Sequence, residues 1–454
     1  MKYFTNSSGY DSKKVFKGYA SKQAEELRNE ILNTVNTEDI YEIKGVRHYI
    51  SKGTSLENIP KNLQPGDAIL FERGGLWRVG DNILKVPNGV ILGAYGQGEK
   101  PKFYGSLNDY ADNSLWEKES ENIWKTNIAY GNVGIMVFDH CAALGVKKWE
   151  MNEVIANYDY YYDYDSGNLY FYYDGDIESD FESIEIGGRG DVILLNSNSI
   201  ADNICVKYTG SHGVILPTAS EGVTITNCEI GFIGGSCQFK QVRFGNGIEM
   251  QLGAKNILVE NNWVYQCYDA GITFQSWDSA NRETYYENII VRKNLVEFCY
   301  YGFEFFTSTE EHGGSYSEIR DVSVDNNIFR FSGYVWCYEQ RPDHWMNSHI
   351  RSRQYGYIEP TFNLKFVNNI FDCSRASIVF WWWHDPERNY IHPDEHPGVI
   401  VSANSFYQAP MPDKRCMCYR YAEPSLAEDL ESFTKGVTLF DKSPKEIVWL
   451  SEIG

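Results

Sequence analysis

Three acidic residues in the middle of the chain have the types and the spacing of a catalytic carboxylate group. Glu249 and Glu304 occupy the same position in two similar segments, GIEMQ and GFEFF, and a third segment between them, GITFQ, carries Thr273 there. Asp269 lies two residues before the GITFQ segment. Cleavage of a glycosidic bond needs a carboxylic acid that donates a proton and a carboxylate that acts as base or nucleophile. Glu249, Asp269 and Glu304 are therefore the candidate catalytic residues.

These segments belong to a repeat. From residue 222 onward, stretches of alternating apolar residues recur, each with an Asn near its middle. The aligned residues are Asn227, Asn262, Asn294, Asn327, Asn369 and Asn404. The steps of two, as in Val223 and Ile225, indicate strands rather than helices. Strand units that repeat in this way predict a parallel β-helix, in which stacked Asn side chains hold one turn.

Each Asn-containing strand is followed by a second strand, and four of these align on Gly247, Gly271, Gly302 and Gly333. One set of alternate residues is apolar and is predicted to face the core: Ile248, Ile272, Phe303 and Tyr334, with Met250, Phe274, Phe305 and Trp336. The other set predicts an outward column of Glu249, Thr273, Glu304 and Val335. Because adjacent coils lie about 4.8 Å apart, the Cα atoms of Glu249 and Glu304 should be about 10 Å apart. Their side chains can then reach the separation of roughly 5 to 9.5 Å that glycosidases use.

Long segments follow the second strands, at 276–287, 308–318, 340–361 and 382–397. We expect all four to leave from the same corner and to form one wall beside the outward column. Aromatic residues in such a wall can stack on pyranose rings, and Arg, Asp and His side chains can bind hydroxyl groups. The candidate substrate-binding residues are Trp277, Asp278, His312, Arg341, Asp343, His344, Trp345, Trp383 and His384.

The remaining parts of the chain predict the ends of the molecule and one insertion. Apolar residues at helical spacing over 21–35, and a capping box at 425–428, predict short helices that cover the exposed edges at the two ends. The Tyr-rich segment 160–176 has the turn sequence of a β-hairpin. The expected organisation is an N-terminal helical cap (1–40), a parallel β-helix (41–410) with an inserted hairpin near 158–176, and a C-terminal extension with a short helix (411–454). The expected fold class is all-β, a right-handed parallel β-helix with helical caps.

Several motifs together resemble a known group of proteins. The sequences GDAILFERGG from Gly66 and GAYGQGEKP from Gly93, the Tyr-rich ribbon and the Asn-centred coils resemble bacterial right-handed parallel β-helix proteins of the pectate-lyase-like superfamily. The chain is most similar to the glycoside hydrolase branch that includes β-xylosidase, lacto-N-biosidase and α-L-fucosidase families. This resemblance implies the fold, but the superfamily also contains polysaccharide lyases, epimerases and tailspikes. No catalytic motif of one family aligns with this chain residue by residue.

Charge and composition restrict the partners. The chain has 41 Lys and Arg against 62 Asp and Glu, for a net charge of −21. This excess disfavours nucleic acid, anionic lipid and polyuronates, because binding to each of them depends on positively charged contacts. Aromatic residues make up 15% of the chain, more than a core needs, and favour stacking on sugars. We therefore expect a neutral oligosaccharide as the partner, with no nucleic acid and no membrane.

Location, cofactors and assembly are further expectations. The N-terminal residues MKYFTNSS have no apolar signal core, and no window approaches 18 consecutive apolar residues, which favours a cytoplasmic protein. No metal or other cofactor is expected, because neither Cys416 and Cys418 nor the His residues at 384, 392 and 396 have the spacing of metal ligands. The sequence is compatible with a homo-oligomer.

These observations favour a glycoside hydrolase acting on a neutral oligosaccharide. A polysaccharide lyase or uronate epimerase is the first alternative. Such an enzyme needs a base and a cation that neutralises the uronate carboxylate, for which Lys240, Arg243 and Arg341 are candidates. A non-catalytic carbohydrate-binding protein is the second alternative, since it would need the aromatic wall but not the carboxylates.

Overall fold

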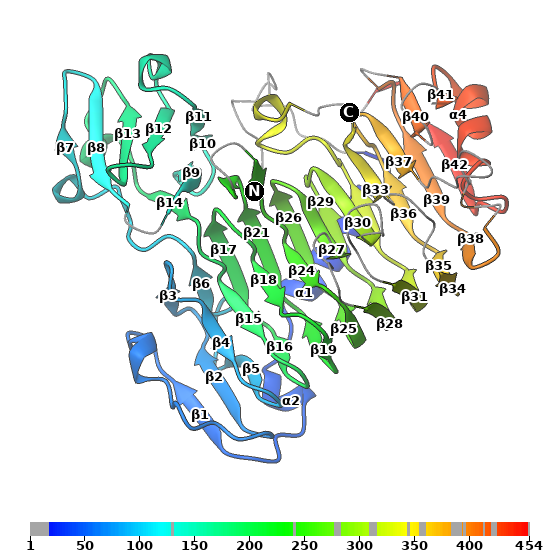
Figure 1. Cartoon of the computed structure of the whole chain (residues 1–454), viewed down its shortest axis with the longest axis horizontal. Coiled ribbons are helices and arrows are strands. Elements are labelled where there is room, and N and C mark those ends of the chain that lie inside the picture. Colours follow the sequence, from blue (N-terminus) through cyan, green and yellow to red (C-terminus); the bar gives the residue numbers. More distant parts are fainter. Residues whose placement is uncertain are drawn as a thin grey trace.

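The computed structural model is a parallel β-helix in which three long sheets wind around one core (Figure 1). The chain passes from sheet A to sheet B to sheet C in each coil, and each strand pairs in parallel with its equivalent in the next coil. The structure describes residues 18–128, 131–238, 242–276, 283–307, 316–342, 346–353, 360–382, 393, 396–411, 414–418 and 425–452. The predicted all-β parallel β-helix is confirmed.

The three sheets extend along the β-helix. Sheet A contains β1 (Arg47–Ile50), β2 (Ala68–Glu72), β5 (Ile91–Tyr95), β16 (Ile200–Asp202), β19 (Ser220–Glu221), β20 (Thr224–Thr226), β25 (Ala254–Glu260), β28 (Thr284–Arg292), β31 (Ser317–Asp325), β34 (Thr361–Phe362), β35 (Leu364–Val367) and β38 (Val399–Ser402). Sheet B contains β3 (Leu76–Arg78), β6 (Lys102–Tyr104), β17 (Cys205–Thr209), β21 (Glu229–Ile233), β26 (Trp263–Cys267), β29 (Leu295–Glu297), β32 (Ile328–Arg330), β36 (Ile370–Asp372), β39 (Ser405–Gln408) and β42 (Glu446–Trp449). Sheet C contains β4 (Leu84–Val86), β15 (Ile193–Leu195), β18 (Val214–Leu216), β24 (Ile248–Gln251), β27 (Ala270–Ser276), β30 (Tyr301–Thr307), β33 (Ser348–Arg353), β37 (Ser377–Trp382), β40 (Arg415–Cys418) and β41 (Ser425–Leu426).

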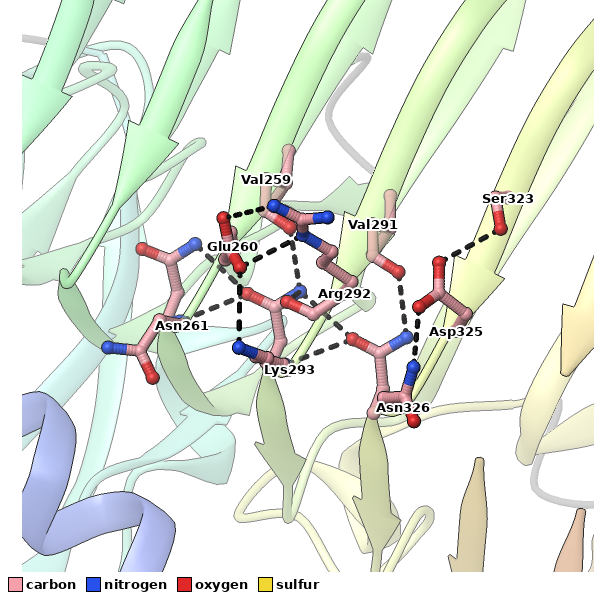
Figure 2. A network of polar contacts seen from close by, with 12 residues as sticks. Val259, Glu260, Asn261, Val291, Arg292, Lys293, Ser323, Asp325 and Asn326 are labelled. Atoms are coloured by element: carbon pink, nitrogen blue, oxygen red, sulfur yellow. Dashed lines mark hydrogen bonds and ion pairs between the residues drawn. The ribbon is translucent and has the colours of Figure 1, made fainter. Parts of the chain in front are cut away.

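Asn side chains form a ladder at the turn between sheets A and B. The side-chain oxygen of Asn294 accepts hydrogen bonds from both the backbone N–H and the side-chain amide of Asn262, each at 3.0 Å. Asn327 does the same for Asn294, and the ladder continues through Asn369 and Asn404 to Asp441. Figure 2 shows the turn, in which Asn261, Lys293 and Asn326 just before the ladder have positive φ angles. Buried backbone groups at the turn are thereby satisfied.

The predicted alignment of the Asn residues is wrong by one residue in its first coil. Asn227 has a φ of 54° and occupies the left-handed position of the turn. Cys228 occupies the ladder position, where its N–H donates to the side-chain oxygen of Asn262 at 2.9 Å. Asn suits both positions, since it tolerates a left-handed backbone and also bonds to neighbouring backbone groups.

Replacing Asn327 by Ala should destabilise the fold. The change removes the acceptor for Asn294 and the donor to the Val291 carbonyl, at 2.9 Å, in a fully buried site. Buried polar groups without partners cost about 1–3 kcal/mol each, so we expect the free energy of unfolding to fall by roughly 2–4 kcal/mol. Urea unfolding measures this, with Asn326→Gly at the adjacent exposed position as control. If the free energy of unfolding fell by the same small amount in both variants, the ladder would have no structural role.

The connection from β6 to β15 is a β-rich insertion, which lies to one side of the coils (Figure 1). Its strands are β7 (Glu117–Lys118), β8 (Ile123–Asn127), β9 (Val133–Phe138), β10 (Ala143–Leu144), β11 (Val146–Lys148), β12 (Asp159–Asp163), β13 (Asn168–Tyr172) and β14 (Ile184–Gly188). The Tyr-rich segment is the antiparallel pair β12–β13. This hairpin is part of a larger unit with its own buried aromatic cluster, and β9 and β14 contact β17 of the β-helix.

The helices cover one side and one end of the coils. Helix α1 (Ser21–Leu32) packs Ala24 and Ile31 against a cluster that includes Trp263 and Tyr265 of sheet B. It therefore covers the outer face of sheet B. The sequence had predicted instead that this helix covers the N-terminal end of the coils. The short helix α2 (Thr37–Ile40) contacts β5, and α3 (Ile177–Asp180) lies in the insertion.

Helix α4 (Leu430–Val437) closes the C-terminal end of the core with Phe433 and Val437. It begins later than predicted: Asp429 and Ser432 form its capping box, whereas Ser425–Leu426 is strand β41. In the described part of the chain, no helix combines the length and the hydrophobicity needed to cross a membrane.

Candidate active site

The outer face of sheet C places two glutamates in one column. Glu249 of β24 pairs in register with Thr273 of β27, and Thr273 pairs with Glu304 of β30. The two glutamates are thus two strands apart, which corresponds to about 10 Å between Cα atoms. Inward neighbours Ile272 and Phe303 lie in the core, as predicted.

The fourth member of the column differs from the prediction. Residues 332–338 are not a strand: Gly333 has a φ of 82°, and a 3-10 helix follows at Tyr338–Gln340. Trp336 and Tyr334 pack in a cluster outside the coils, so they are not core residues of the β-helix. The next strand is β33, in which Arg351 pairs with Glu304. An arginine therefore occupies the place that was assigned to Val335.

A pocket of about 420 Å³ lies over this column. All three candidate catalytic carboxylates line it, together with three arginines: the charged residues are Glu249, Asp269, Glu304, Arg243, Arg341 and Arg351. His212, Gln275 and Asn246 complete much of the polar lining. The formal charges of these carboxylates and arginines balance, although the chain as a whole is strongly negative.

Glu249 is a buried carboxyl group that lies beside two side-chain amides and His212. Its side-chain oxygen accepts hydrogen bonds from the amides of Asn246 and of Gln275, the latter at 2.9 Å. Nδ1 of His212 lies 3.8 Å away and accepts the backbone N–H of Asn246, so a neutral His212 carries its proton on Nε2. Burial raises the pKa of Glu249 above its ordinary value, and His212, Gln275 and Asn246 offset part of the rise. A raised pKa suits a general acid.

Replacing Gln275 by Leu should raise the pKa of Glu249 further. The amide stabilises the ionised carboxylate, so its removal favours the protonated form. If Glu249 is the acid, the alkaline limb of the kcat/KM profile should move upward by about one pH unit. Gln251→Leu is the control, because Gln251 is the register partner of Gln275 on β24 and lines the same pocket. Identical pH profiles for the two variants would contradict the assignment.

Glu304 is equally buried but has a charged neighbour. Its carboxylate forms an ion pair with the guanidinium of Arg351, which lies 4.5 Å above the ring of Tyr301. Positive charge beside a carboxylate stabilises the ionised form. Glu304 thus has the surroundings of a base or nucleophile, in contrast to Glu249.

Asp269 is the most exposed of the three carboxylates. It lies at the corner between sheets B and C, where Nη1 of Arg341 contacts Oδ1 at 3.1 Å. The guanidinium of Arg341 also stacks on Tyr300, 3.7 Å from the ring centre, and donates to the Tyr268 carbonyl. Arg341 is therefore held in the pocket wall beside Asp269 and Tyr300.

One of the four predicted wall segments, 340–361, differs in its origin, whereas the other three follow the sheet C strands β27, β30 and β37. Arg341 follows β32, so it leaves the corner between sheets B and C and not the corner after sheet C. The loop that carries Arg243 and the insertion leave from the same B–C corner. The other predicted binding residues, Trp277, Asp278, His312, Asp343, His344, Trp345, Trp383 and His384, lie outside the described residues.

Sequence reasoning missed six polar residues of the pocket: Arg351, His212, Gln238, Asn246, Gln251 and Gln275. Gln251 and Gln275 were detectable as the outward residues two positions after Glu249 and Thr273, whereas Arg351 would have required recognition of β33. His212 and Asn246 lie in turns, where the repeat gives no orientation. Within the described ranges, no group of three or more His, Cys, Asp or Glu side chains could hold a metal ion.

Comparisons with known proteins give little beyond this geometry. No protein-family model and no curated protein matches the chain. Similar solved structures include "The complex structure of XylC with xylose" (12% identity, 80% of this chain and 70% of that chain covered, TM-score 0.46). Others are a glycoside hydrolase (8%, 89% and 96%, TM-score 0.42) and an alginate lyase from Paenibacillus sp. str. FPU-7 (10%, 82% and 98%, TM-score 0.36). These similarities are too weak to assign an activity, and the strand order itself defines a parallel β-helix protein.

Proposed function

We propose that the chain is a glycoside hydrolase that cleaves a neutral oligosaccharide in the pocket over sheet C. One observation carries the proposal: Glu249 and Glu304 line the same pocket from strands on either side of β27, and burial raises the pKa of Glu249 whereas Glu304 forms an ion pair with Arg351. Two carboxyl groups whose surroundings favour opposite protonation states are the arrangement that glycoside hydrolysis requires.

The roles follow from these surroundings. Glu249, whose pKa is raised by burial, donates a proton to the leaving oxygen. Glu304, beside Arg351, acts on the sugar carbon directly as nucleophile or through a water molecule as base. Asp269 and Arg341 bind sugar hydroxyl groups at the edge of the pocket, where Asp269 is partly exposed and Arg341 lies beside it with 9% of its side chain exposed.

A lyase or epimerase acting on a uronate is the second candidate, and the three arginines of the pocket favour it. Their contacts, however, are largely made within the protein. Arg351 and Arg341 pair with Glu304 and Asp269, and Arg243 donates to two backbone carbonyls and to Gln340. Most of this positive charge is already compensated, which favours the neutral substrate.

A screen of aryl glycosides and oligosaccharides, with product analysis by mass, tests the proposal. Hydrolysis adds one water to the cleaved substrate. A lyase gives an unsaturated product that absorbs in the near ultraviolet and contains no added water. The first result supports the proposal, and the second would replace it by the lyase.

A further inference from the structure

Two more cavities continue from the candidate active site toward the insertion. A cavity of about 570 Å³ shares Val242, Arg243 and Arg341 with the active-site pocket and extends to Trp149. A further cavity of about 310 Å³, formed by the insertion, also includes Trp149, together with Tyr161 and Asp163. Because they share lining residues, the three cavities lie next to one another in a row from the carboxylates on sheet C to the β12–β13 hairpin, and we call this row the groove.

Trp149 lies at the point where the two cavities meet. It follows β11 directly and is 44% exposed, which is high for a Trp in a well-ordered β-unit. Its position is nevertheless fixed, because its backbone N–H donates to Oε2 of Glu153 at 3.0 Å, next to the capping box of Glu150 and Glu153. The backbone at Trp149 is therefore held in place, and 44% of the side chain remains exposed, with Nζ of Lys147 5.9 Å from the ring centre.

The insertion and the pocket wall are held together by Gln340. Its side-chain oxygen accepts hydrogen bonds from the N–H of Lys147 at 3.4 Å and from Nη1 of Arg243 at 3.0 Å. Its amide donates to the Gly145 carbonyl at 3.3 Å. In Figure 1, β11 accordingly lies near the yellow loop that follows β32. Gln340 thus fixes the distance from Trp149 to Arg341 and the catalytic carboxylates.

We propose that Trp149 forms a distal sugar-binding subsite, so that the insertion binds the part of an oligosaccharide that extends beyond the cleavage site. The inference rests on the proposed function and adds the length of the substrate. A flat exposed ring gives stacking area for a pyranose, and the groove beside it offers Glu339, Asp163 and Lys148 for hydroxyl groups. Continuity with the candidate active site favours an extended glycan as the occupant.

The test is the dependence of affinity on glycan length. Fragments of two and of six sugar units from xylan, cellulose, mannan and galactan are titrated calorimetrically into Glu304→Gln, which prevents turnover, with and without Trp149→Ala. We expect six-unit fragments of at least one glycan to bind more tightly than two-unit fragments, and Trp149→Ala to lower this ratio about tenfold. Trp149→Phe should retain most of the preference for six-unit over two-unit fragments.

Tyr49→Ala is the matched control, because Tyr49 is 50% exposed on β1, the first strand of sheet A, and lines none of the three cavities of the groove. An unchanged ratio in Trp149→Ala, an equal loss in Tyr49→Ala, or no dependence of affinity on length would overturn the subsite. The measurement does not depend on cleavage. A failure of the hydrolase proposal would appear in the product screen, and a failure of the subsite only in the affinity ratio.

Discussion

Replacing Glu304 by Gln should lower kcat on any cleavable substrate by about 10⁴-fold, the largest effect we expect from a single substitution. The change keeps the size of the side chain but removes the negative charge that acts on the sugar carbon. KM should change much less, because bound hydroxyl groups lose few contacts. Steady-state kinetics with the best substrate of the product screen measures both quantities.

Glu297→Gln is the matched control for this variant. Glu297 belongs to the same coil, is 1% exposed and pairs with Arg28 and Arg330, but it lies under α1 on sheet B. Each variant removes one carboxylate that pairs with a buried arginine, Arg351 in Glu304→Gln and Arg330 in Glu297→Gln, so both should lower the melting temperature. Only Glu304→Gln should abolish turnover. Comparable kcat values in the two folded variants would remove Glu304 from the mechanism.

Replacing Glu249 by Gln should lower kcat by about 10³-fold for substrates with a poor leaving group, because such groups depart only when protonated. The loss should be much smaller for aryl glycosides with an acidic phenol, which leaves without a proton. This difference between substrates is specific to a general acid. A loss of equal size on both substrate types would contradict that role.

The pH dependence of the unmodified enzyme tests independently whether Glu249 is the general acid. Burial raises the pKa of Glu249 from its ordinary value of 4.5, so the acid remains protonated at higher pH than an exposed glutamate. Activity should fall as the pH rises through this raised pKa, and should also fall at low pH when the partner carboxylate is protonated. Glu229→Gln, a change of a buried glutamate in the same coil that pairs with Lys207, should keep this profile.

The coil architecture could be predicted from the sequence because it depends on periodic signals. Alternating apolar residues and the recurrent Asn define strands and a turn, and a one-residue shift would expose the core face of a whole strand. The register of Glu249, Thr273 and Glu304 was obtained in this way and agrees with the structure. Asn227 was misplaced because Asn suits both adjacent positions of the turn.

The position of Arg351 beside Glu304 could not be predicted by the same reasoning. The segment 332–338 has an alternating apolar pattern and a Gly at the expected place, but it folds outside the coils. The true strand, β33, has the polar sequence SHIRSR and follows a long connection, so it lacks the repeat signal. With β33 unrecognised, the segment 340–361 was assigned to the corner after sheet C, although Arg341 leaves the corner between sheets B and C.

Cleavage in water enriched in oxygen-18 measures the central claim most directly. If Glu249 and Glu304 form a hydrolytic pair, the new reducing end must carry one oxygen-18 atom, and this product must disappear in Glu304→Gln while Glu297→Gln still forms it. A cleaved product without the heavy oxygen, or labelled product at an undiminished rate from Glu304→Gln, would contradict the proposed site.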